Sequence, residues 1–363
     1  MKNSFGSSII TTLFGESHGE MIGAVIDGLA PGIEIDEPFI SSRLSLRRPQ
    51  GKISTKRQEK DSFQIVSGVF NSKTTGTPVC ILIKNENTKS KDYEKTMSLI
   101  RPSHADYTAE CKYHGFQDYR GGGHFSGRLT ASLVAAGAIA IKMLEKKNIF
   151  VGTHIKQLSD IKDREFDSFE DDIKYLSNEY YPVLDEEVKE KMIEKTESVA
   201  SEGDSIGGIL ETVVTGVPCG VGEPWFDSVE SQLSHILFSV PGIKGVEFGK
   251  GFGFADGLGS ELNDGYFVEN GKIRTLQNNN GGINGGITNG ENIIFRCAVK
   301  PTPSIYKEQD TVDIKKMENA KLIIEGRHDP AIIHRARIVV DSVTALAVAD
   351  MLAQRFSTDY FME

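Results

Sequence analysis

Residues 129–147 constrain the fold more than any other part of this 363-residue chain. They read LTASLVAAGAIAIKMLEKK, which is apolar on every face of a helix until Lys142 and then highly charged. A helix that is apolar all round is buried in the middle of a domain, with other layers packed against it. It is too short, and too rich in glycine and alanine, for a membrane span. We therefore predict a central core helix, joined by a second apolar helix at residues 343–356.

Short apolar runs bounded by glycine and proline predict the elements around that core. The predicted strands are 9–13, 22–26, 63–70, 78–83, 206–217, 293–299 and 338–340. Helices are predicted at 37–46 and at 227–238, the second with Asp227 as its N-cap. Residues 156–204 differ, because acidic residues and lysine dominate there and glycine is nearly absent. We interpret this segment as a charged, mostly helical excursion on the outside of a single domain that spans 1–363.

The charge of the chain limits the partners that it can have. A formal net charge of −10 argues against a nucleic-acid surface, which needs a broad positive field. The arginines nevertheless gather in three groups: 43, 47, 48 and 57; 101, 120 and 128; 327, 335 and 337. Basic clusters beside glycine favour small, highly anionic ligands, although solvated charge runs are the plain alternative.

Cysteine spacing and hydropathy limit the metal content and the location. The four cysteines are far apart and form no Cys-x-x-Cys pair, so we expect neither a disulfide framework nor a metal site. The start of the chain, MKNSFGSSIITT, lacks a signal-peptide core, and no run reaches ~18 apolar residues. These features predict a cytoplasmic protein that does not enter a membrane.

Residues 101–128 carry most of the chemistry that the sequence offers. This stretch, RPSHADYTAECKYHGFQDYRGGGHFSGR, holds three histidines and three arginines, and no amphipathic helix is expected to run through it. Three consecutive glycines, Gly121–Gly123, let backbone N–H groups approach a ligand beside fixed guanidinium groups. His104 lies between Ser103 and Asp106, which could orient an imidazole for proton transfer. A solvated surface loop would explain one such stretch equally well.

Other glycine- or proline-rich loops repeat this composition, and their convergence would create a large, cationic, histidine-bearing site. They cover residues 14–19, 47–60, 241–245, 278–290, 300–304 and 326–330. Ser17 and His18 are adjacent and no Gly-x-Ser-x-Gly elbow is present, so a serine hydrolase is disfavoured. Neither a Walker A sequence nor a strand-Gly-x-Gly-x-x-Gly-helix unit occurs, which disfavours a P-loop or dinucleotide-binding fold.

Eight motifs in these loops, in the family's own order, resemble the chorismate synthase family. They are FGESHG (14–19), RRP (47–49), RPSHADY (101–107), DYRGGGHFSGR (118–128), IKGVEFGKGF (243–252), NNNGGINGGI (278–287), KPTPSI (300–305) and GRHDP (326–330). The resemblance implies an α+β fold, a β-α-β sandwich with helices between antiparallel sheets. It also implies the last step of the shikimate pathway, a 1,4-trans elimination of phosphate from 5-enolpyruvylshikimate 3-phosphate that yields chorismate.

The resemblance further implies a cofactor, an assembly and an electron source. Family members need reduced FMN although the reaction has no net redox change, and they usually form homotetramers. A separate flavin reductase would supply the electrons, because no extra domain for NADPH-dependent reduction is evident. The clustered arginines fit this chemistry, since the substrate carries a phosphate and two carboxylates and FMN adds another phosphate.

Roles for individual residues follow from the same resemblance. His18 would be the acid near the leaving phosphate, His104 would protonate or stabilise the reduced flavin around N1, and Asp329 would handle the proton at N5. The side chains predicted to hold the substrate are Ser17, Arg47, Lys52, Arg101, Arg128 and Arg327. The predicted flavin contacts are His124, Phe125, Ser126, Pro241, Gly242, Gly285, Lys300, Pro301, Thr302, Pro303, Ser304 and Arg327.

The chain departs from the family pattern at four places. After the three glycines it has His124-Phe125-Ser126-Gly127-Arg128 where Arg-Ser-Ser-Ala-Arg is common, so one cation becomes titratable. Ser103 replaces a usual glycine, and Pro303 replaces a frequent serine. The loop after Pro49 is about one residue shorter than in many members, which weakens the match of Lys52.

Two other classes of protein remain open alternatives. One is a flavin-binding module with NADPH-dependent FMN reductase activity, as in bifunctional relatives, and FMN-dependent NADPH oxidation would identify it. The other is a catalytically inactive anion-binding scaffold, against which the retention of His18, His104 and Asp329 speaks.

Overall fold

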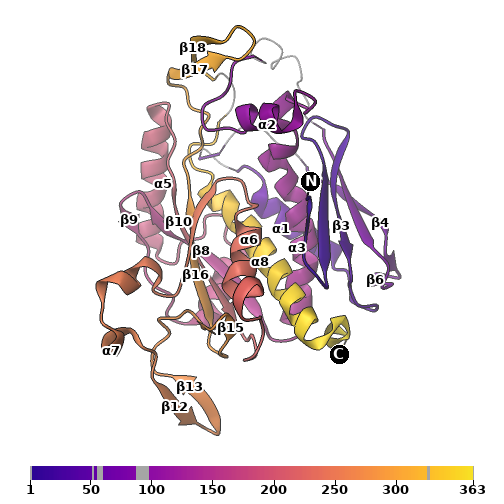
Figure 1. Ribbon diagram of the computed structural model, residues 1–363, viewed down its shortest axis with the longest axis vertical. Coiled ribbons are helices and arrows are strands. Elements are labelled where there is room, and N and C mark those ends of the chain that lie inside the picture. The colour runs from indigo at the N-terminus through magenta and orange to yellow at the C-terminus, as the bar shows by residue number, and fades with distance from the viewer. Residues whose placement is uncertain (1, 51–52, 55–59, 87–97, 325–327, 363) are drawn as a thin grey trace.

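The computed structural model describes residues 2–50, 53–54, 60–86, 98–324 and 328–362. One five-stranded antiparallel sheet has the spatial order β1-β2-β3-β7-β4 (Figure 1). Its strands are β1 (Ser4–Phe5), β2 (Ile10–Gly15), β3 (Met21–Asp27), β7 (Val79–Lys84) and β4 (Phe63–Ser67). The alternation in β7 turns Val79, Ile81 and Ile83 into the core, as the period of two in a strand requires.

A second five-stranded antiparallel sheet has the order β11-β16-β10-β8-β9. Its strands are β11 (Ile243–Phe248), β16 (Ile293–Val299), β10 (Gly208–Thr215), β8 (Phe150–Leu158) and β9 (Ile161–Lys162). In β16 the buried residues alternate from Ile293 to Val299, so this sheet also presents one apolar face. Both apolar faces need cover, and the two long helices supply it.

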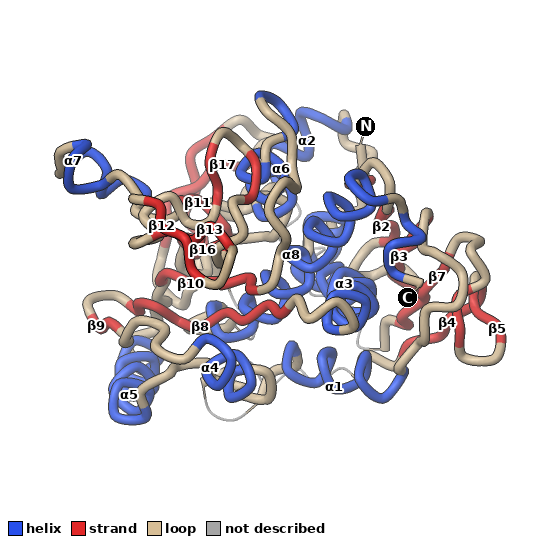
Figure 2. Tube along the Cα trace, turned by 90° about the horizontal axis from the view of Figure 1, so that it is seen from below, coloured by secondary structure: helices blue, strands red, loops and turns tan. Residues whose placement is uncertain are grey.

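Helices α3 (Thr130–Glu145) and α8 (Ile333–Phe356) lie between the two sheets, as Figure 2 shows end on. α3 packs on β3 and β7, α8 packs on β8 and β10, and the two helices pack on each other. They approach closely at Gly137, where an added Cβ would overlap the Cβ of Ser342. The α+β sandwich with helices between antiparallel sheets is therefore confirmed.

The core helix is also the segment with the composition of a membrane span. Among the described residues, 127–145 are long and apolar enough to cross a bilayer by length and composition, so the prediction that this helix is too short for a membrane span was wrong. Because 83% of that window is buried inside the protein, the segment is the core helix predicted from the sequence. Two shorter helices, α1 (Glu37–Arg47) and α6 (Val229–Leu237), pack along α8, and α1 also packs along α3.

The remaining described elements are small and lie around this sandwich. The helices are α2 (Asp106–Tyr113), α4 (Phe169–Leu176), α5 (Glu186–Ser201) and α7 (Gly259–Leu262). The two-stranded units are β5 (Val69–Phe70) with β6 (Lys73–Thr74), β12 (Tyr266–Glu269) with β13 (Lys272–Thr275), β14 (Ile283–Asn284) with β15 (Ile287–Thr288), and β17 (Gln309–Asp313) with β18 (Glu318–Leu322).

Three details of the predicted secondary structure were wrong. Residues 338–340, Ile-Val-Val, are not a strand but lie inside α8, because burial between two sheets outweighs the β preference of branched side chains. The N-cap of α6 is Ser228, whose hydroxyl accepts from the Ser231 amide, and not Asp227. A short helix, α2, also lies within 101–128, where we expected none.

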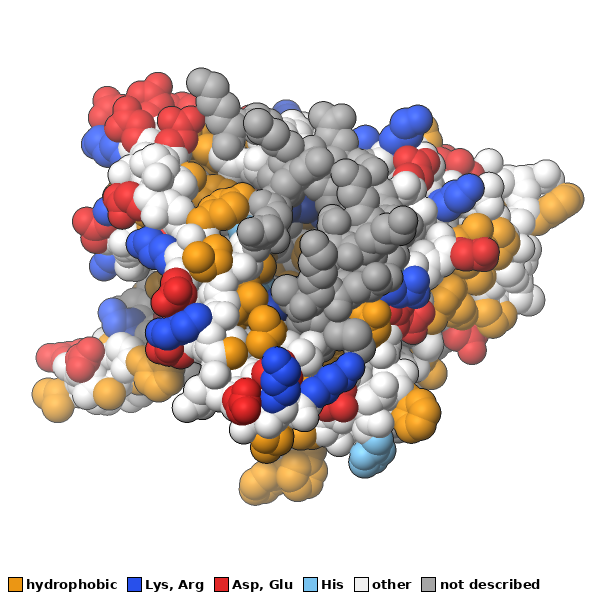
Figure 3. Space-filling model, turned by 90° about the horizontal axis from the view of Figure 1, so that it is seen from above, with side chains coloured by type: hydrophobic (Ala, Val, Ile, Leu, Met, Phe, Trp, Pro, Cys, Tyr) orange, Lys and Arg blue, Asp and Glu red, His pale blue; other side chains and the backbone are white. Residues whose placement is uncertain are grey.

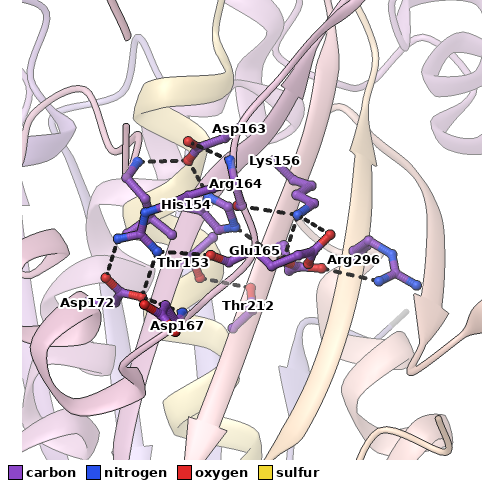
Figure 4. Close-up of polar contacts among 12 residues, drawn as sticks. Thr153, His154, Lys156, Asp163, Arg164, Glu165, Asp167, Asp172, Thr212 and Arg296 are labelled. Carbon is purple, nitrogen blue, oxygen red and sulfur yellow. Dashed lines mark hydrogen bonds and ion pairs between the residues drawn. The ribbon is translucent and has the colours of Figure 1, made fainter. Parts of the chain in front are cut away.

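A buried charge network joins residues 156–204 to the second sheet (Figure 4). His154 on β8 is fully buried between Asp163 (2.7 Å) and Glu211 (3.2 Å). Asp163 also accepts hydrogen bonds from the backbone N–H groups of Leu184 and Asp185, which immediately precede α5. Burial alone would lower the pKa of His154, but the two carboxylates outweigh it and raise the pKa.

Candidate active site

A cavity of about 860 Å³ lies at the end of the sandwich where α3 and α8 begin. Its walls come from both sheets, from the segment that includes α2, and from the turns before α3. Thr130 at the start of α3 and Ile332 just before α8 both line it, so the positive ends of two long helix dipoles face the cavity. Figure 3 shows this end of the molecule, where basic, acidic and apolar side chains are interspersed on the described surface.

The three glycines form the turn between the cavity and His18. Gly121, Gly122 and Gly123 have φ of 59°, 85° and 52°, and these positive values kink the chain within residues 120–125, before the 3₁₀ turn at 127–129. A Cβ at Gly121 would overlap the ring of His18, so this position must be glycine for the ring to stay in place. The Ser17 hydroxyl donates to the Gly121 carbonyl (3.1 Å) and lies 3.2 Å from Nδ1 of His18. His18 is therefore buried directly behind the turn that these three glycines form.

His104 lies in the cavity wall and contacts a loop almost 200 residues away. Its Nδ1 lies 3.1 Å from the Pro102 carbonyl, so Nδ1 donates, and Nε2 accepts from the Ser304 hydroxyl at 3.0 Å. Burial, and next the charge of Arg101, lower the pKa of His104 to about 4. The imidazole is therefore neutral near pH 7 and ready to accept a proton at Nε2.

Two arginines near the glycine turn are paired with carboxylates. Arg101 binds Asp106 through Nε (2.8 Å) and Nη2 (2.7 Å), and it lines the cavity beside His104. Arg120 binds Asp118 in the same bidentate manner. Burial opposes the charge of Asp106, but its contacts with Arg101 outweigh that effect and lower the pKa of the carboxyl.

Most of the predicted flavin contacts line this same cavity. They are His124, Phe125, Ser126, Pro241, Gly242, Lys300, Pro301, Thr302 and Pro303. His124 donates from Nδ1 to the Gly15 carbonyl (2.8 Å), and Lys300 donates from Nζ to the Ser103 carbonyl (2.8 Å). Oγ1 of Thr302 is buried and has no hydrogen-bond partner among the described residues. Such an orphaned hydroxyl in a cavity wall indicates a missing ligand atom.

Arg47 and Arg128 form a second cluster around one buried carboxylate. Asp61, with its side chain fully buried, contacts Nη1 of Arg47 (3.2 Å) and Nη1 of Arg128. Arg47 also donates from Nε to the Thr130 hydroxyl (2.8 Å), and Arg128 donates from Nε to Asn85 (3.0 Å). Because Thr130 lines the cavity, this cluster lies directly behind its wall.

Asp61→Asn is expected to lower the free energy of unfolding by about 3–5 kcal/mol, since it leaves two buried guanidinium groups without their shared carboxylate. Urea unfolding followed by circular dichroism measures the change. Glu34→Gln is the control, because Glu34 forms an exposed ion pair with Lys146 at 3.8 Å and its loss should leave the midpoint unchanged. Equal midpoints for all three proteins would contradict the importance of Asp61.

Asp329 contacts the Arg47 segment through Arg335. Nη1 of Arg335 binds Oδ2 of Asp329 (2.6 Å), and its Nε donates to the Arg47 carbonyl (2.8 Å). Asp329 is not among the described residues that line the cavity, although Ile332, three residues later, is. The structure therefore places His104 in the cavity, His18 behind the glycine turn, and Asp329 beside the arginine cluster.

His334, which precedes Arg335 on α8, gives the fold a measurable acid sensitivity. Burial, and next the charge of Arg335, lower the pKa of His334 to about 3, against about 6.5 in the unfolded chain. Only the unfolded chain takes up this proton between those pH values, so stability falls as the pH drops below about 6.5. Relative to His334→Gln, the wild type should lose about 2 kcal/mol of unfolding free energy between pH 7 and pH 5. Urea titrations at both pH values test this, and a constant difference would contradict it.

Three predicted site residues are not among the described residues that line the cavity or contact it. Gly285 lies in the β14–β15 turn, away from the described lining of the cavity. Lys52 and Arg327 lie outside the described residues. The sequence analysis missed Asp61 and Asn85, which hold the arginines, and His235 on α6, which lines the cavity. The described residues contain no group of His, Cys, Asp or Glu side chains that could hold a metal ion.

Comparison with known proteins gives a consistent result along the whole chain. A family model described as chorismate synthase matches residues 9–353. The chain is 45% identical over 350 residues to a chorismate synthase of Thermococcus gammatolerans, which covers 96% of this chain and 97% of the relative. It is 47% identical over 358 residues to that of Lachnoclostridium phytofermentans, covering 98% and 96%.

A solved crystal structure of chorismate synthase superposes with a TM-score of 0.75 at 26% identity, covering 96% of this chain and 93% of the other. Sequence and fold therefore agree over almost the whole length, and this chain belongs to the chorismate synthase family.

Proposed function

We propose that reduced FMN and 5-enolpyruvylshikimate 3-phosphate bind together in the 860 Å³ cavity. In this arrangement His104 lies between the two ligands on one side and residues 300–304 on the other. The supporting observation is that His104, the turn after the three glycines and Lys300–Pro303 line one cavity although they are far apart in sequence. Its volume is within the range of sites that enclose whole cofactors and drug-sized ligands.

The overall reaction follows from the family. The chain is a carbon–oxygen lyase acting on phosphates, which removes phosphate from 5-enolpyruvylshikimate 3-phosphate by 1,4-trans elimination and forms chorismate. This reaction supplies the precursor of the aromatic amino acids.

The cavity suits a phosphate-bearing flavin in its chemistry as well as its size. The positive ends of α3 and α8, the ammonium group of Lys300 and the imidazole of His124 provide favourable contacts for a phosphate. Phe125, whose ring packs edge-on against Tyr113 at 6.0 Å, offers an apolar surface to an aromatic ring system. The hydroxyl of Thr302 provides a hydrogen-bond donor that no other described residue uses.

Thr302→Val should weaken FMN binding about tenfold, because it removes a buried hydroxyl that we assign to the flavin while keeping the shape of the side chain. Titration of oxidised FMN, followed by the quenching of flavin fluorescence, measures the dissociation constant. Thr302→Ser keeps the hydroxyl and should bind like the wild type. If Thr302→Val also binds FMN like the wild type, the hydroxyl does not contact the flavin.

The side chains of the site manage protons and anions. When bound, reduced FMN supplies electron density to the breaking carbon–oxygen bond. His104 accepts a proton at Nε2 and holds it close to the cofactor, and the Pro102 carbonyl fixes the tautomer through Nδ1. His18 provides a proton for the leaving phosphate, and the contact of Ser17 with Nδ1 orients its ring. We propose Asp329, which Arg335 orients, as the proton acceptor of the site.

The substrate carries three anionic groups, and arginines suit their planar and tetrahedral oxygens. Arg101 in the cavity wall, and Arg47 and Arg128 behind it, are the described arginines that we assign to this task. We assign Lys52 and Arg327 to the substrate on the sequence motif alone.

Large exposed apolar residues support self-association, and we propose the homotetramer that is usual for the family. Trp225, Phe226 and Phe252 are 85%, 90% and 86% exposed in the single chain. Trp225 and Phe226 are adjacent in the sequence, and neighbouring exposed apolar side chains mark protein–protein contacts. Light scattering after gel filtration should give four times the chain mass. A cytoplasmic location and a separate flavin reductase as electron source belong to the same proposal.

Phosphate release under anaerobic conditions, with chemically reduced FMN and the substrate, tests the function. We expect release that requires both ligands and leaves the flavin reduced at the end. Release without FMN would exclude the proposed cofactor role. FMN-dependent oxidation of NADPH by the purified chain would show that it makes its own reduced flavin, and no separate reductase would then be needed.

A further inference from the structure

Described residues at and after the end of α1 are held by side chains from two other parts of the fold. These are the first turn of α8 and Tyr180, which lies within residues 177–185. The segment to which the held residues belong begins at Arg47, which we assign to the substrate. Its described residues include Gln50 and Ser54, on either side of Lys52 in the sequence. The contacts that hold these residues involve three side chains, Tyr180, His334 and Arg335. None of the three belongs to a family motif, and the proposed chemistry uses only Arg335, which orients Asp329.

Tyr180, His334 and Ser54 form a compact triangle of hydrogen-bonding groups. The Tyr180 hydroxyl accepts from the backbone N–H of Gln50 (2.8 Å) and lies 3.0 Å from the Ser54 hydroxyl. Nε2 of His334 lies 2.9 Å from the Ser54 hydroxyl and 3.2 Å from that of Tyr180. Ser54 is 7% exposed and His334 is 1% exposed, so water competes little for these contacts.

Arg335 connects the same segment to a proposed catalytic group. Its Nε donates to the Arg47 carbonyl and its Nη1 binds Asp329. Consecutive residues of one helix therefore hold the segment at two points, Arg47 and Ser54, and Tyr180 holds it at a third, Gln50. Residues held in this way, here Arg47, Gln50 and Ser54, lose little further freedom when an anion binds beside them.

The support for Tyr180 is itself rigid. The segment 177–185 lies between α4 and α5, and buried arginines from the core hold its backbone. Nη1 of Arg43 on α1 donates to the Ser177 carbonyl (2.6 Å), and Nη2 of Arg337 on α8 donates to the Glu179 carbonyl. The ring of Tyr181 stacks on His334 with the centroids 5.6 Å apart. The hydroxyl of Tyr180 is thus a fixed point and not a mobile surface group.

We propose that Tyr180 and His334 are positioning residues for the chorismate synthase reaction, which fix the described residues 47–50 and 53–54 in the conformation in which Arg47 binds the anionic substrate. The inference rests on the proposed function, in which Arg47 binds substrate. Neither residue touches the reacting atoms. They hold the residues around Arg47 in place before the substrate binds. Without them, substrate binding itself would have to order these residues, so the loss of Tyr180 or His334 raises KM more than it lowers kcat.

Tyr180→Phe tests the proposal with the smallest change, because it removes only the hydroxyl. We expect KM for 5-enolpyruvylshikimate 3-phosphate to rise about 5- to 10-fold, because one or two buried hydrogen bonds are lost. The kcat should stay within twofold of the wild-type value. The dissociation constant of FMN should not change, and the melting temperature should fall by no more than a few degrees. Tyr181→Phe is the matched control, since its ring also packs on His334 but its hydroxyl meets none of the described residues of 47–54.

A conservative rescue separates positioning from packing. In His334→Gln the amide nitrogen can replace Nε2 and reach both hydroxyls, whereas His334→Leu fills the space without a polar atom. We expect the leucine variant to raise KM as Tyr180→Phe does and the glutamine variant to restore it. An unchanged KM in Tyr180→Phe, or a fall in melting temperature that accounts for the loss, would overturn the inference while leaving the function intact. A wild-type chain that releases no phosphate would overturn both.

Discussion

His104→Ala is expected to lower kcat by about 10²–10⁴-fold, the range of general acid–base assistance by one side chain. The imidazole of His104 lies in the cavity wall, and among its described contacts Nε2 meets only the Ser304 hydroxyl. Anaerobic phosphate release with reduced FMN gives kcat directly. Flavin affinity should change little, because the predicted flavin contacts at Thr302 and His124 are retained.

The low pKa of His104 makes this prediction more specific. Burial and the charge of Arg101 lower this pKa to about 4 in the ligand-free protein. Anionic ligands in the cavity would raise the pKa again, because negative charge favours the protonated imidazole. Ser304→Ala removes only the hydroxyl that donates to Nε2 and should cost much less than His104→Ala. Equal turnover for His104→Ala and the wild type would refute the role of His104.

Gly121→Ala is the second change with a large expected effect, a fall in kcat of about 10²-fold. An added Cβ would overlap Cε1 and Nδ1 of His18 and lie 3.0 Å from the Ser17 hydroxyl. The backbone at Gly121 also has φ of 59°, which alanine adopts only at a cost of about 1–2 kcal/mol. The ring of His18 must therefore move, and a displacement of ~1 Å is enough to cost two orders of magnitude.

Gly127→Ala provides the matched control for this substitution. Gly127 lines the same cavity six residues later, but a Cβ there meets nothing within 4 Å and its φ is not positive. We expect nearly wild-type kcat for Gly127→Ala and a melting temperature within a few degrees for both variants. If both variants lose activity equally, the cavity wall in general, and not the His18 ring, explains the effect. If neither does, His18 does not act from its present position.

The sequence predicted those parts of the fold that depend on local pattern. Residues 129–147 are apolar on every face, and burial between two sheets is the arrangement that satisfies such a helix. Strand 293–299 was predicted at the bounds that the structure has, because its alternation and flanking loops are both clear. Residues 338–340 misled the prediction because a β-branched triplet has the same appearance in a strand and in a buried helix.

The candidate site depends on contacts that no local pattern contains. Ser304 meets His104 because β16 pairs with β10 and β11, which brings residues 300–304 to the cavity. The resemblance to the family named both residues, but their meeting is a property of the fold. Asp61 was missed because a single acid after a cationic loop has no distinctive spacing, and its role appears only when Arg47 and Arg128 converge on it. Tyr180 and His334 were missed for the same reason.

A crystal structure of this protein with oxidised FMN and 5-enolpyruvylshikimate 3-phosphate tests the central claim most directly. We predict the flavin in the 860 Å³ cavity, between the turn at 121–126 and residues 300–304, with Nε2 of His104 within hydrogen-bonding distance of the ring system. The substrate phosphate should lie on the side of His18 and the arginines. A flavin bound elsewhere, or a substrate that occupies a cavity without His104, would contradict the claim.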